Sequence, residues 1–213
     1  EREDVTHIIG SPDIDVMNSG SLPSLADVKD RYEINFDNYG VLIFHPVTTE
    51  LGSLQTHIDV LIKALINSKK NFVVIYPNND HGSEIIFNAY EQLANNINFR
   101  VFPSMRFEHF LQLLKNAKFM IGNSSAGVRE APHFGVPTVN LGSRQNNRVS
   151  LPSIINIDFD VDSIAQAIQD VEMQSYEKAK IFGDGNSAEK FYEILSNKNF
   201  WNIAKQKFFV DLK

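Results

Sequence analysis

The sequence predicts an α/β fold in which a parallel sheet of about six strands carries helices on both faces. Short apolar runs alternate along the chain with longer segments whose apolar residues recur every three or four positions. Almost continuously apolar runs are typical of parallel strands, because both faces of such a sheet are buried. With 213 residues, of which 43% are apolar, the chain can bury a full core. We therefore expect one domain over residues 1–213.

Composition narrows the classes of function. The net charge of −6 argues against nucleic acid or an anionic membrane as a partner. The absence of Cys excludes disulfides and thiol chemistry and suits a cytoplasmic protein. The six His lack a metal-ligand spacing, so we expect neither a metal nor another cofactor. There is no 18-residue apolar run and no signal peptide at the start.

The predicted elements follow one another closely. A short strand over 5–10 ends in the turn Gly10-Ser11-Pro12-Asp13, and a helix over 24–32 starts at the good cap residue Ser24. Three strand–helix pairs come next, with strands at 40–45, 71–76 and 99–102 and helices at 51–66, 85–93 and 107–114. Towards the end we expect a strand at 153–157 and helices at 164–171, 186–195 and 199–209. Asn186 and Glu189 form a predicted capping box.

The prediction of function depends mainly on residues 118–148. They predict a strand at 119–121, a turn at 122–124, a helix of about two turns from Ser125, and a strand at 136–141. Asn123 or Ser124 can cap this helix, and Pro132 and Gly135 end it. We expect the turn to lie at the carboxyl end of its strand, where ligands bind in parallel sheets.

The first turn of that predicted helix suits a phosphate group. Its backbone N–H groups carry partial positive charge, and the small Ser125, Ala126 and Gly127 let an anion approach them. The hydroxyl groups of Ser124 and Ser125 add donors. Glu130 shares the helix face of Gly127, where its carboxylate could accept hydrogen bonds from a ribose diol. A plain serine-capped turn is the alternative, and on spacing alone the two interpretations stand about even.

Other polar residues also follow predicted strands. His45 ends the strand at 40–45, where its imidazole could donate to a diphosphate or move a proton, although a structural His is the simpler interpretation. For the loop at 78–81 we favour solvation over sugar contact. Arg144 could bind phosphate or lie in a solvated loop.

One stretch resembles a known family. The segment Gly122-Asn-Ser-Ser-Ala-Gly-Val-Arg-Glu-Ala-Pro132, with Gly135-Val-Pro-Thr138 and Arg144-Gln145, resembles the UDP-N-acetylglucosamine 2-epimerase family. It is most similar to the hydrolysing branch, which serves sialic and related nonulosonic acid synthesis. The resemblance covers about residues 10–195 and only the second half of a typical member. It implies a Rossmann-like domain that is one half of a two-domain GT-B architecture, with the first half outside this chain.

The resemblance also implies roles for individual residues. His45 would stabilise the leaving diphosphate, and Phe110 would contact the uracil, although a core role for Phe110 is equally open. The substrate-binding set would be Asn123, Ser124, Ser125, Gly127, Glu130, Arg144 and Gln145. Pro46 follows His45, as in the hydrolysing branch, whereas the non-hydrolysing branch has Arg there.

The implied partners are UDP and UDP-N-acetylglucosamine or a related UDP-sugar, and the sequence does not exclude a homo-oligomer. The implied reaction releases N-acetylmannosamine and UDP. Its acid and base carboxylates belong to the family's first domain and have no match here, so we expect this chain alone to be inactive. Two other functions stay open, namely the donor domain of a GT-B glycosyltransferase and a non-catalytic UDP-sugar-binding module.

Overall fold

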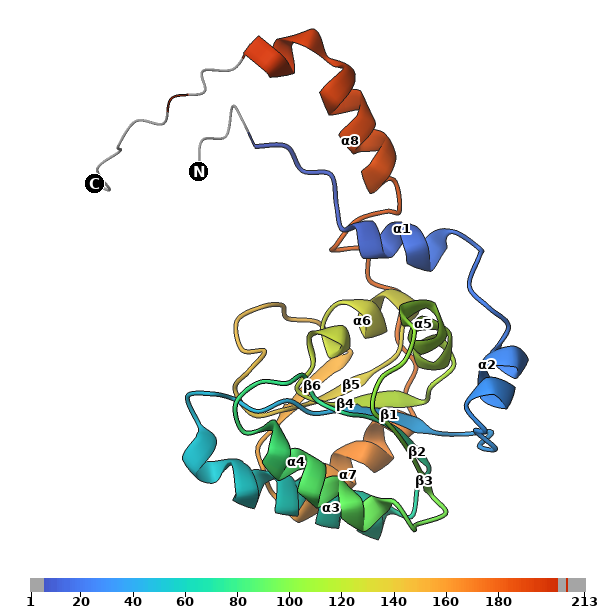
Figure 1. Ribbon diagram of the computed structural model, residues 1–213, viewed down its shortest axis with the longest axis vertical. Coiled ribbons are helices and arrows are strands. Elements are labelled where there is room, and N and C mark those ends of the chain that lie inside the picture. Colours follow the sequence, from blue (N-terminus) through green and yellow to red (C-terminus); the bar gives the residue numbers. More distant parts are fainter. Residues whose placement is uncertain (1–5, 203–205, 207–213) are drawn as a thin grey trace. The chain divides into compact units, whose positions relative to one another are not determined.

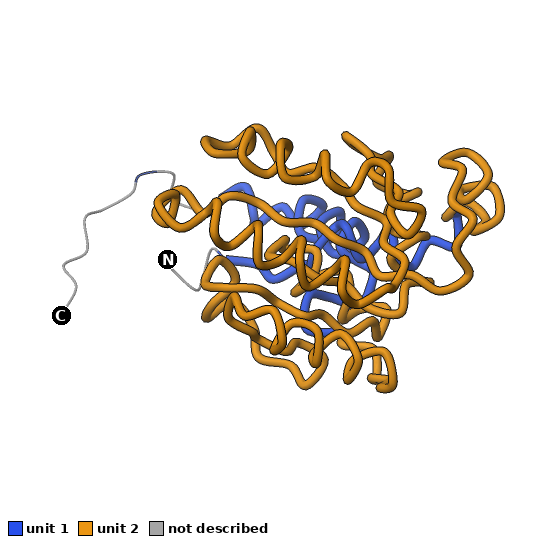
Figure 2. The backbone as a smooth tube through the Cα atoms, turned by 90° about the horizontal axis from the view of Figure 1, so that it is seen from below, with its two compact units in different colours: residues 1–21, 180–213 blue, residues 22–179 orange. Residues whose placement is uncertain are grey.

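The computed structural model describes residues 6–202 and 206. The chain forms two compact units (Figure 2). We call residues 22–179 the sheet domain. The terminal unit combines residues 1–21 with residues 180–213, so it is built from both ends of the chain.

The sheet domain contains the predicted parallel sheet. Within the described residues, six strands pair in parallel in the order β3-β2-β1-β4-β5-β6 (Figure 1). The order reverses between β1 and β4, and ligands bind in sheets of this kind at the carboxyl ends of the strands beside such a reversal. The strands are β1 Gly40–Ile43, β2 Phe72–Ile75, β3 Phe99–Phe102, β4 Phe119–Gly122, β5 Thr138–Leu141 and β6 Ile154–Ile157.

Helices cover both faces of the sheet, as predicted (Figure 1). One face carries α3 Leu54–Ser68, α4 Ser83–Tyr90 and α7 Val161–Glu172, and the other carries α5 Phe107–Lys115 and α6 Glu130–Phe134. The remaining helices of this domain are α2 Leu25–Arg31 and the 3₁₀ turns η2 Leu51–Ser53, η3 Glu91–Leu93 and η4 Ser125–Gly127. The predicted apolar stripe of α3 is buried in the core, including Ile58, Leu61 and Leu65.

Gly122 is required where the strand order reverses. It pairs with Ile43 across β1 and β4, and its φ is +128°. A Cβ atom built on Gly122 would lie 2.0 Å from the carbonyl oxygen of Ile43. Any other residue would therefore have to separate the two strand ends or strain the backbone.

The structure of the terminal unit differs from the prediction at both of its segments. Residues 6–10 are not a strand, and the expected turn at 10–13 is the start of the helix α1 Pro12–Asn18. Proline suits this first helical position because its missing N–H would have no partner within the helix. The helix α8 Ser187–Ser196 begins as predicted, but the side chain of Asn186 makes no capping hydrogen bond.

Asp15 of α1 caps α8 in its place. Its carboxylate accepts from the backbone N–H of Ser187 at 3.0 Å and of Ala188 at 2.9 Å, and from the Ser187 hydroxyl at 2.8 Å. A carboxylate bonds to helix N–H groups more strongly than a neutral amide, so the capping box is replaced by a distant residue. These bonds also keep the pKa of Asp15 below its usual value, with the backbone N–H groups contributing most.

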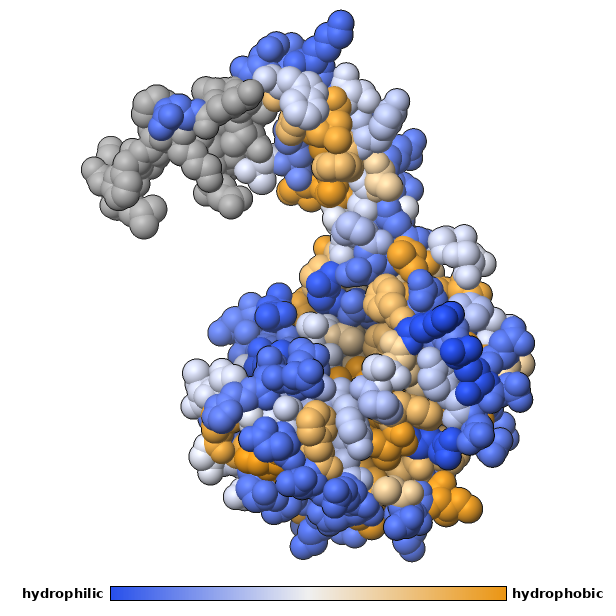
Figure 3. All heavy atoms as spheres, in the orientation of Figure 1, coloured by the Kyte–Doolittle hydropathy of each residue, from blue (hydrophilic) through white to orange (hydrophobic). Residues whose placement is uncertain are grey.

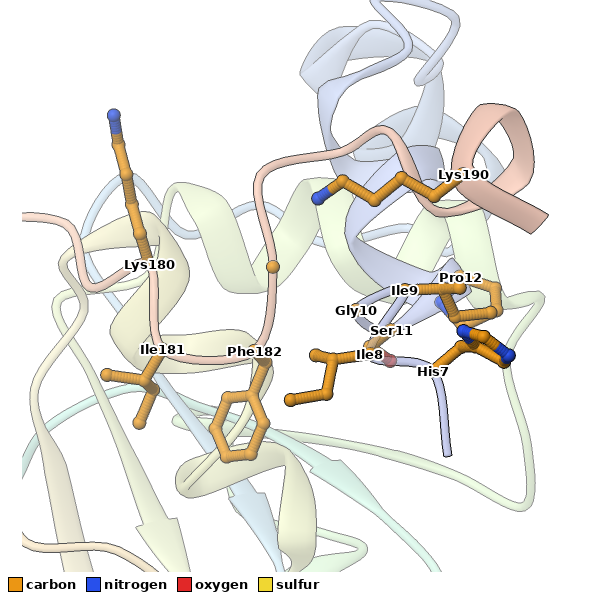
Figure 4. A pocket seen from close by; sticks show the side chains of 11 residues that line it. His7, Ile8, Ile9, Gly10, Ser11, Pro12, Lys180, Ile181, Phe182 and Lys190 are labelled. Atoms are coloured by element: carbon orange, nitrogen blue, oxygen red, sulfur yellow. The ribbon is translucent and has the colours of Figure 1, made fainter. Parts of the chain in front are cut away.

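Apolar side chains reach the surface of the terminal unit. Figure 3 shows apolar surface over α8, on which Phe191 and Tyr192 are exposed. A hollow between the two segments of the unit is lined by Ile8, Pro12 and Phe182 among others (Figure 4).

A helix was also expected at 199–209. The structure has the 3₁₀ turn η5 Lys198–Asn202 at its start, and residues 203–205 and 207–209 lie outside the described part. None of the helices described is long and apolar enough to cross a membrane.

Candidate functional site

Four of the predicted site residues meet at the carboxyl edge of the sheet. His45 follows β1, Asn123 follows β4, and Arg144 and Gln145 follow β5. These strands are consecutive in the sheet, and the reversal of strand order lies between β1 and β4. The residues come from sequence positions about a hundred apart, so only the parallel topology places them side by side.

Asn123 holds the backbone of His45. Its Oδ1 accepts from the His45 N–H at 2.7 Å, and its Nδ2 donates to the His45 carbonyl at 2.8 Å. The Asn123 side chain therefore bonds to the segment after β1 much as a neighbouring strand would. Asn123 is 1% exposed, and its side chain bonds to the protein's own backbone.

Arg144 and Gln145 are anchored to the same residue. The carbonyl oxygen of Asn123 accepts from Nη1 of Arg144 at 3.2 Å and from Nε2 of Gln145 at 2.8 Å. Gln145 is 3% exposed, and its Oε1 has no hydrogen-bond partner among the described residues. A buried amide oxygen in this position is available to a donor group on a ligand.

His45 is a neutral hydrogen-bond donor. The backbone N–H of Asn78 donates to its Nδ1 at 3.2 Å, so the ring proton belongs on Nε2. Burial lowers the pKa of His45 to about 4, and the nearby charge of Arg144 acts in the same direction. The charge of Asp80 opposes both effects. At neutral pH the ring can therefore donate through Nε2 without carrying a positive charge.

Two residues of the loop at 78–81 belong to the site, although we favoured solvation for this loop. Asn78 sets the tautomer of His45, and Asp80 influences both His45 and Arg144 electrostatically. Burial lowers the pKa of Arg144 and Asp80 raises it, and a guanidinium stays charged through such shifts. The sequence did offer one indication that this loop belongs to the site: the loop directly follows β2, which is the neighbour of β1 in the sheet.

The helix predicted from Ser125 is broken into two parts. Residues 125–127 form the 3₁₀ turn η4, and α6 starts only at Glu130. Ser124 caps η4 as predicted, since its Oγ accepts from the Ala126 N–H at 3.3 Å. The Gly127 N–H also donates to the Ser124 carbonyl at 3.1 Å. The continuous two-turn helix with open N–H groups was therefore a wrong prediction, because Ser124 takes up two of those groups.

Gly127 is small for a packing reason. A Cβ atom there would lie 2.6 Å from Cγ2 of Thr138, and the Thr138 hydroxyl donates to the Gly127 carbonyl at 2.7 Å. These contacts hold η4 against β5. The turn is thus placed beside the group of residues around Asn123.

The two residues expected to contact the nucleoside lie on neighbouring helices. Phe110 belongs to α5 and Glu130 begins α6, and these helices pack against each other. Each residue is 8% exposed. A carboxylate is rarely this buried, which marks Glu130 as unusual in the domain.

The strand order defines a Rossmann-like domain, and the polar, cationic edge has donors of the kind that anionic ligands need. Comparison with known proteins identifies the family. The family model described as UDP-N-acetylglucosamine 2-epimerase matches residues 1–196, so the chain belongs to this family.

Relatives and solved structures agree with that assignment. The chain is 46% identical over 216 residues to a UDP-N-acetylglucosamine 2-epimerase of Neisseria meningitidis, covering 100% of this chain and 57% of the relative. It is 27% identical to a hydrolyzing UDP-N,N'-diacetylbacillosamine 2-epimerase of Legionella pneumophila, covering 92% and 52%. The chain thus spans little more than half the length of these relatives.

The fold is that of solved epimerases. The structure matches UDP-GlcNAc 2-epimerase of Methanocaldococcus jannaschii in complex with UDP-GlcNAc and UDP with a TM-score of 0.73 at 17% identity, covering 92% of this chain and 56% of the other. It matches the E. coli ADP-heptose heptosyltransferase II with a TM-score of 0.53 at 15% identity, covering 70% and 51%. The Rossmann-like prediction, as one half of the GT-B architecture, is confirmed.

Proposed function

We propose that residues 1–213 form the UDP-binding, C-terminal half of a UDP-N-acetylglucosamine 2-epimerase. The observation that carries the proposal is the pairing of a neutral His45 donor with the cationic Arg144 at the strand reversal. An anionic ligand needs such donors, and the chain's family acts on nucleotide sugars. A structural neighbour with the same fold is a complex with UDP-GlcNAc and UDP, which supports this ligand class.

The diphosphate would lie between β1 and η4. His45 donates through Nε2, Arg144 contributes a full positive charge, and the hydroxyl of Ser125 is partly exposed at the turn. Ser124 can donate its hydroxyl proton while its oxygen accepts from Ala126. Two backbone N–H groups of η4 are already bonded within the protein. Side-chain donors would therefore contribute more to diphosphate binding than the backbone N–H groups of this turn.

The nucleoside would lie along α5 and α6. The carboxylate of Glu130 would accept both hydroxyl groups of the ribose, and Phe110 would cover the uracil with its ring. Both side chains are largely buried, so the ligand would meet only their edges. Gln145 would accept a hydrogen bond from the ligand through Oε1.

The proposed reaction proceeds by elimination and then hydration. A base removes the proton on C2 of the sugar while the C1–O bond to UDP breaks, which gives 2-acetamidoglucal and UDP. Water then adds across the new double bond, and N-acetylmannosamine is released. His45 and Arg144 stabilise the charge that develops on the leaving diphosphate, and we assign the C2 base to the half of the protein that precedes this chain.

The hydrolysing outcome rests on Pro46, which follows His45 where an Arg is typical of the non-hydrolysing branch. Both the Legionella relative and a Campylobacter jejuni relative are named as hydrolyzing, whereas the name of the Neisseria relative specifies no outcome. A diacetamido sugar undergoes the same chemistry as N-acetylglucosamine. An assay of the full-length protein with both UDP-sugars, with NMR detection of the released sugar, decides the substrate and the outcome.

A glycosyltransferase donor domain is the second candidate, because the heptosyltransferase shares the fold. Release of UDP by the full-length protein without an acceptor, together with free N-acetylmannosamine, supports the epimerase. UDP release only with an acceptor supports the transferase, and binding without release supports a non-catalytic module. The isolated 213-residue chain should not turn over substrate, and turnover would refute our assignment of the C2 base.

The binding site can be tested separately by calorimetry with UDP. Glu130→Ala should weaken binding by about 1–3 kcal/mol, because the ribose diol loses a buried acceptor. Glu130→Gln keeps the size of the side chain and one acceptor oxygen, so it should lose less. Unchanged affinity in Glu130→Ala would remove Glu130 from the site.

A further inference from the structure

Every polar group of Asn123 makes a hydrogen bond to another described residue. Its backbone N–H donates to the Ile43 carbonyl at 3.2 Å, and its carbonyl oxygen accepts from Arg144 and Gln145. Its side chain is bonded at both ends to the backbone of His45. The residue therefore connects the segments that follow β1, β4 and β5.

Asn123 makes this connection beyond the ends of β1 and β4, where the pairing of the two strands has stopped. The strand pairing of β1 and β4 ends at Ile43 and Gly122, so the residues beyond these strands have no further strand register to hold them. An amide that bonds to both the N–H and the C=O of one residue fixes the orientation of that peptide segment, since two bonds leave little rotation. His45 is consequently held at its backbone by Asn123 and at its ring by the Asn78 N–H.

We infer that Asn123 is a positioning residue whose side-chain amide sets the direction of the His45 Nε2–H, while its backbone carbonyl anchors the Arg144 guanidinium. Removing the amide would move His45 relative to the diphosphate and leave the acceptor for Arg144 in the backbone, although Asn123 itself would not touch the ligand. The inference rests on the proposed function only in naming the diphosphate as the group that His45 and Arg144 meet.

The test compares Asn123→Ala with the wild-type 213-residue chain. In ¹⁵N-detected NMR, wild-type His45 should show the Nε2–H tautomer, whereas the variant should show a mixture of tautomers or a shifted ring signal. Calorimetry with UDP should show affinity reduced by roughly tenfold to a hundredfold, as expected when donors are misplaced by about 1 Å. Should Asn123→Ala fail to fold, Asn123→Asp keeps the oxygen that accepts from the His45 N–H and replaces the donor to the His45 carbonyl with a carboxylate oxygen that repels it.

A matched control is Asn71→Asp. Asn71 also donates its Nδ2 to a backbone carbonyl, that of Asn38 at 3.1 Å, but it lies just before β2 at the opposite edge of the sheet. This variant should leave the His45 signal and the UDP affinity within about twofold of the wild type.

Three results would overturn the inference. The first is a His45 signal and UDP affinity unchanged by the Asn123 variants. The second is an affinity loss with an unchanged His45 signal, which would mean that Asn123 acts on the ligand directly. The third is an equal loss in Asn71→Asp. If wild-type protein does not bind UDP, the proposed function fails, and the His45 spectra still decide whether Asn123 positions the ring.

Discussion

The sheet domain and the terminal unit are built by different interactions. In the sheet domain, strands and helices that follow one another in sequence bury a continuous apolar core, and the polar residues gather at one edge. In the terminal unit, hydrogen bonds join segments from opposite ends of the chain. Asp15 caps α8 from 172 residues away, and the Ser11 N–H donates to the Phe182 carbonyl at 2.8 Å.

The two units should therefore tolerate different substitutions. An apolar core is non-directional, so many side chains of similar volume fit it. Polar contacts depend on particular atoms in particular places, and they connect His45, Asn123, Arg144 and Gln145 in the candidate site. We therefore expect the largest losses of stability where the sheet backbone needs one residue, and the most local losses in the terminal unit.

The largest effect is expected for Gly122→Ala. The new Cβ would lie 2.0 Å from the Ile43 carbonyl oxygen on a backbone with φ +128°, which should cost about 3–5 kcal/mol of the free energy of unfolding. Urea denaturation measures it. Gly52→Ala is the control, since nothing among the described residues lies within 4 Å of the Cβ position there, and it should change stability by less than about 0.5 kcal/mol. Equal effects in both would contradict the close approach of β1 and β4.

The second effect is a dependence of stability on pH. Burial holds the pKa of His45 at about 4 in the folded chain, against about 6.5 in the unfolded chain. Between these values the unfolded chain binds a proton that the folded chain does not, so stability falls on acidification by up to about 3 kcal/mol.

Urea denaturation between pH 7 and pH 4 should show this loss, and His45→Gln should remove it. The same change at His81, an exposed residue of the loop after β2, should leave the loss in place. A wild-type chain whose stability is flat across this interval would show that His45 is not buried as a neutral ring.

A smaller loss is expected for Thr138→Val, which keeps the packing against Gly127 and removes one hydrogen bond. The Gly127 carbonyl would lose its 2.7 Å donor in a buried place, at a cost of about 1–2 kcal/mol. Thermal unfolding of Thr138→Val measures this loss of stability, with Thr48→Val at an exposed position as the control. Equal stability in the two variants would mean that η4 is not held to β5 by this bond.

The smallest and most local effect is expected for Asp15→Ala. Hydrogen exchange should show loss of protection in the first turn of α8, while the amides of β1 keep theirs. The lowered pKa of Asp15 means that its cap is complete above the unfolded pKa and is lost as pH falls through the folded value. Asn186→Ala should leave α8 protected, and a loss there would restore the capping box that the sequence predicted.

Much of the sheet domain could be predicted because its signals are local. The strand at 99–102 and the cap at Ser24 were predicted as they stand in the structure, since each depends on residues within a few positions. The interval from Ser125 to Glu130 was predicted as one helix because its composition permits one. The tertiary contact between Gly127 and Thr138 goes with a tight 3₁₀ turn there instead.

The parallel α/β fold, the family and the position of His45, Arg144 and Gln145 at strand ends could be predicted from the sequence, because periodicity and short motifs are properties of neighbouring residues. The bond from Asn123 to His45, the influence of Asp80 on the site and the capping of α8 by Asp15 became visible only in the folded chain. These contacts join residues that are far apart in the chain, and hydrogen bonds and charges act over distances in space that no local pattern encodes.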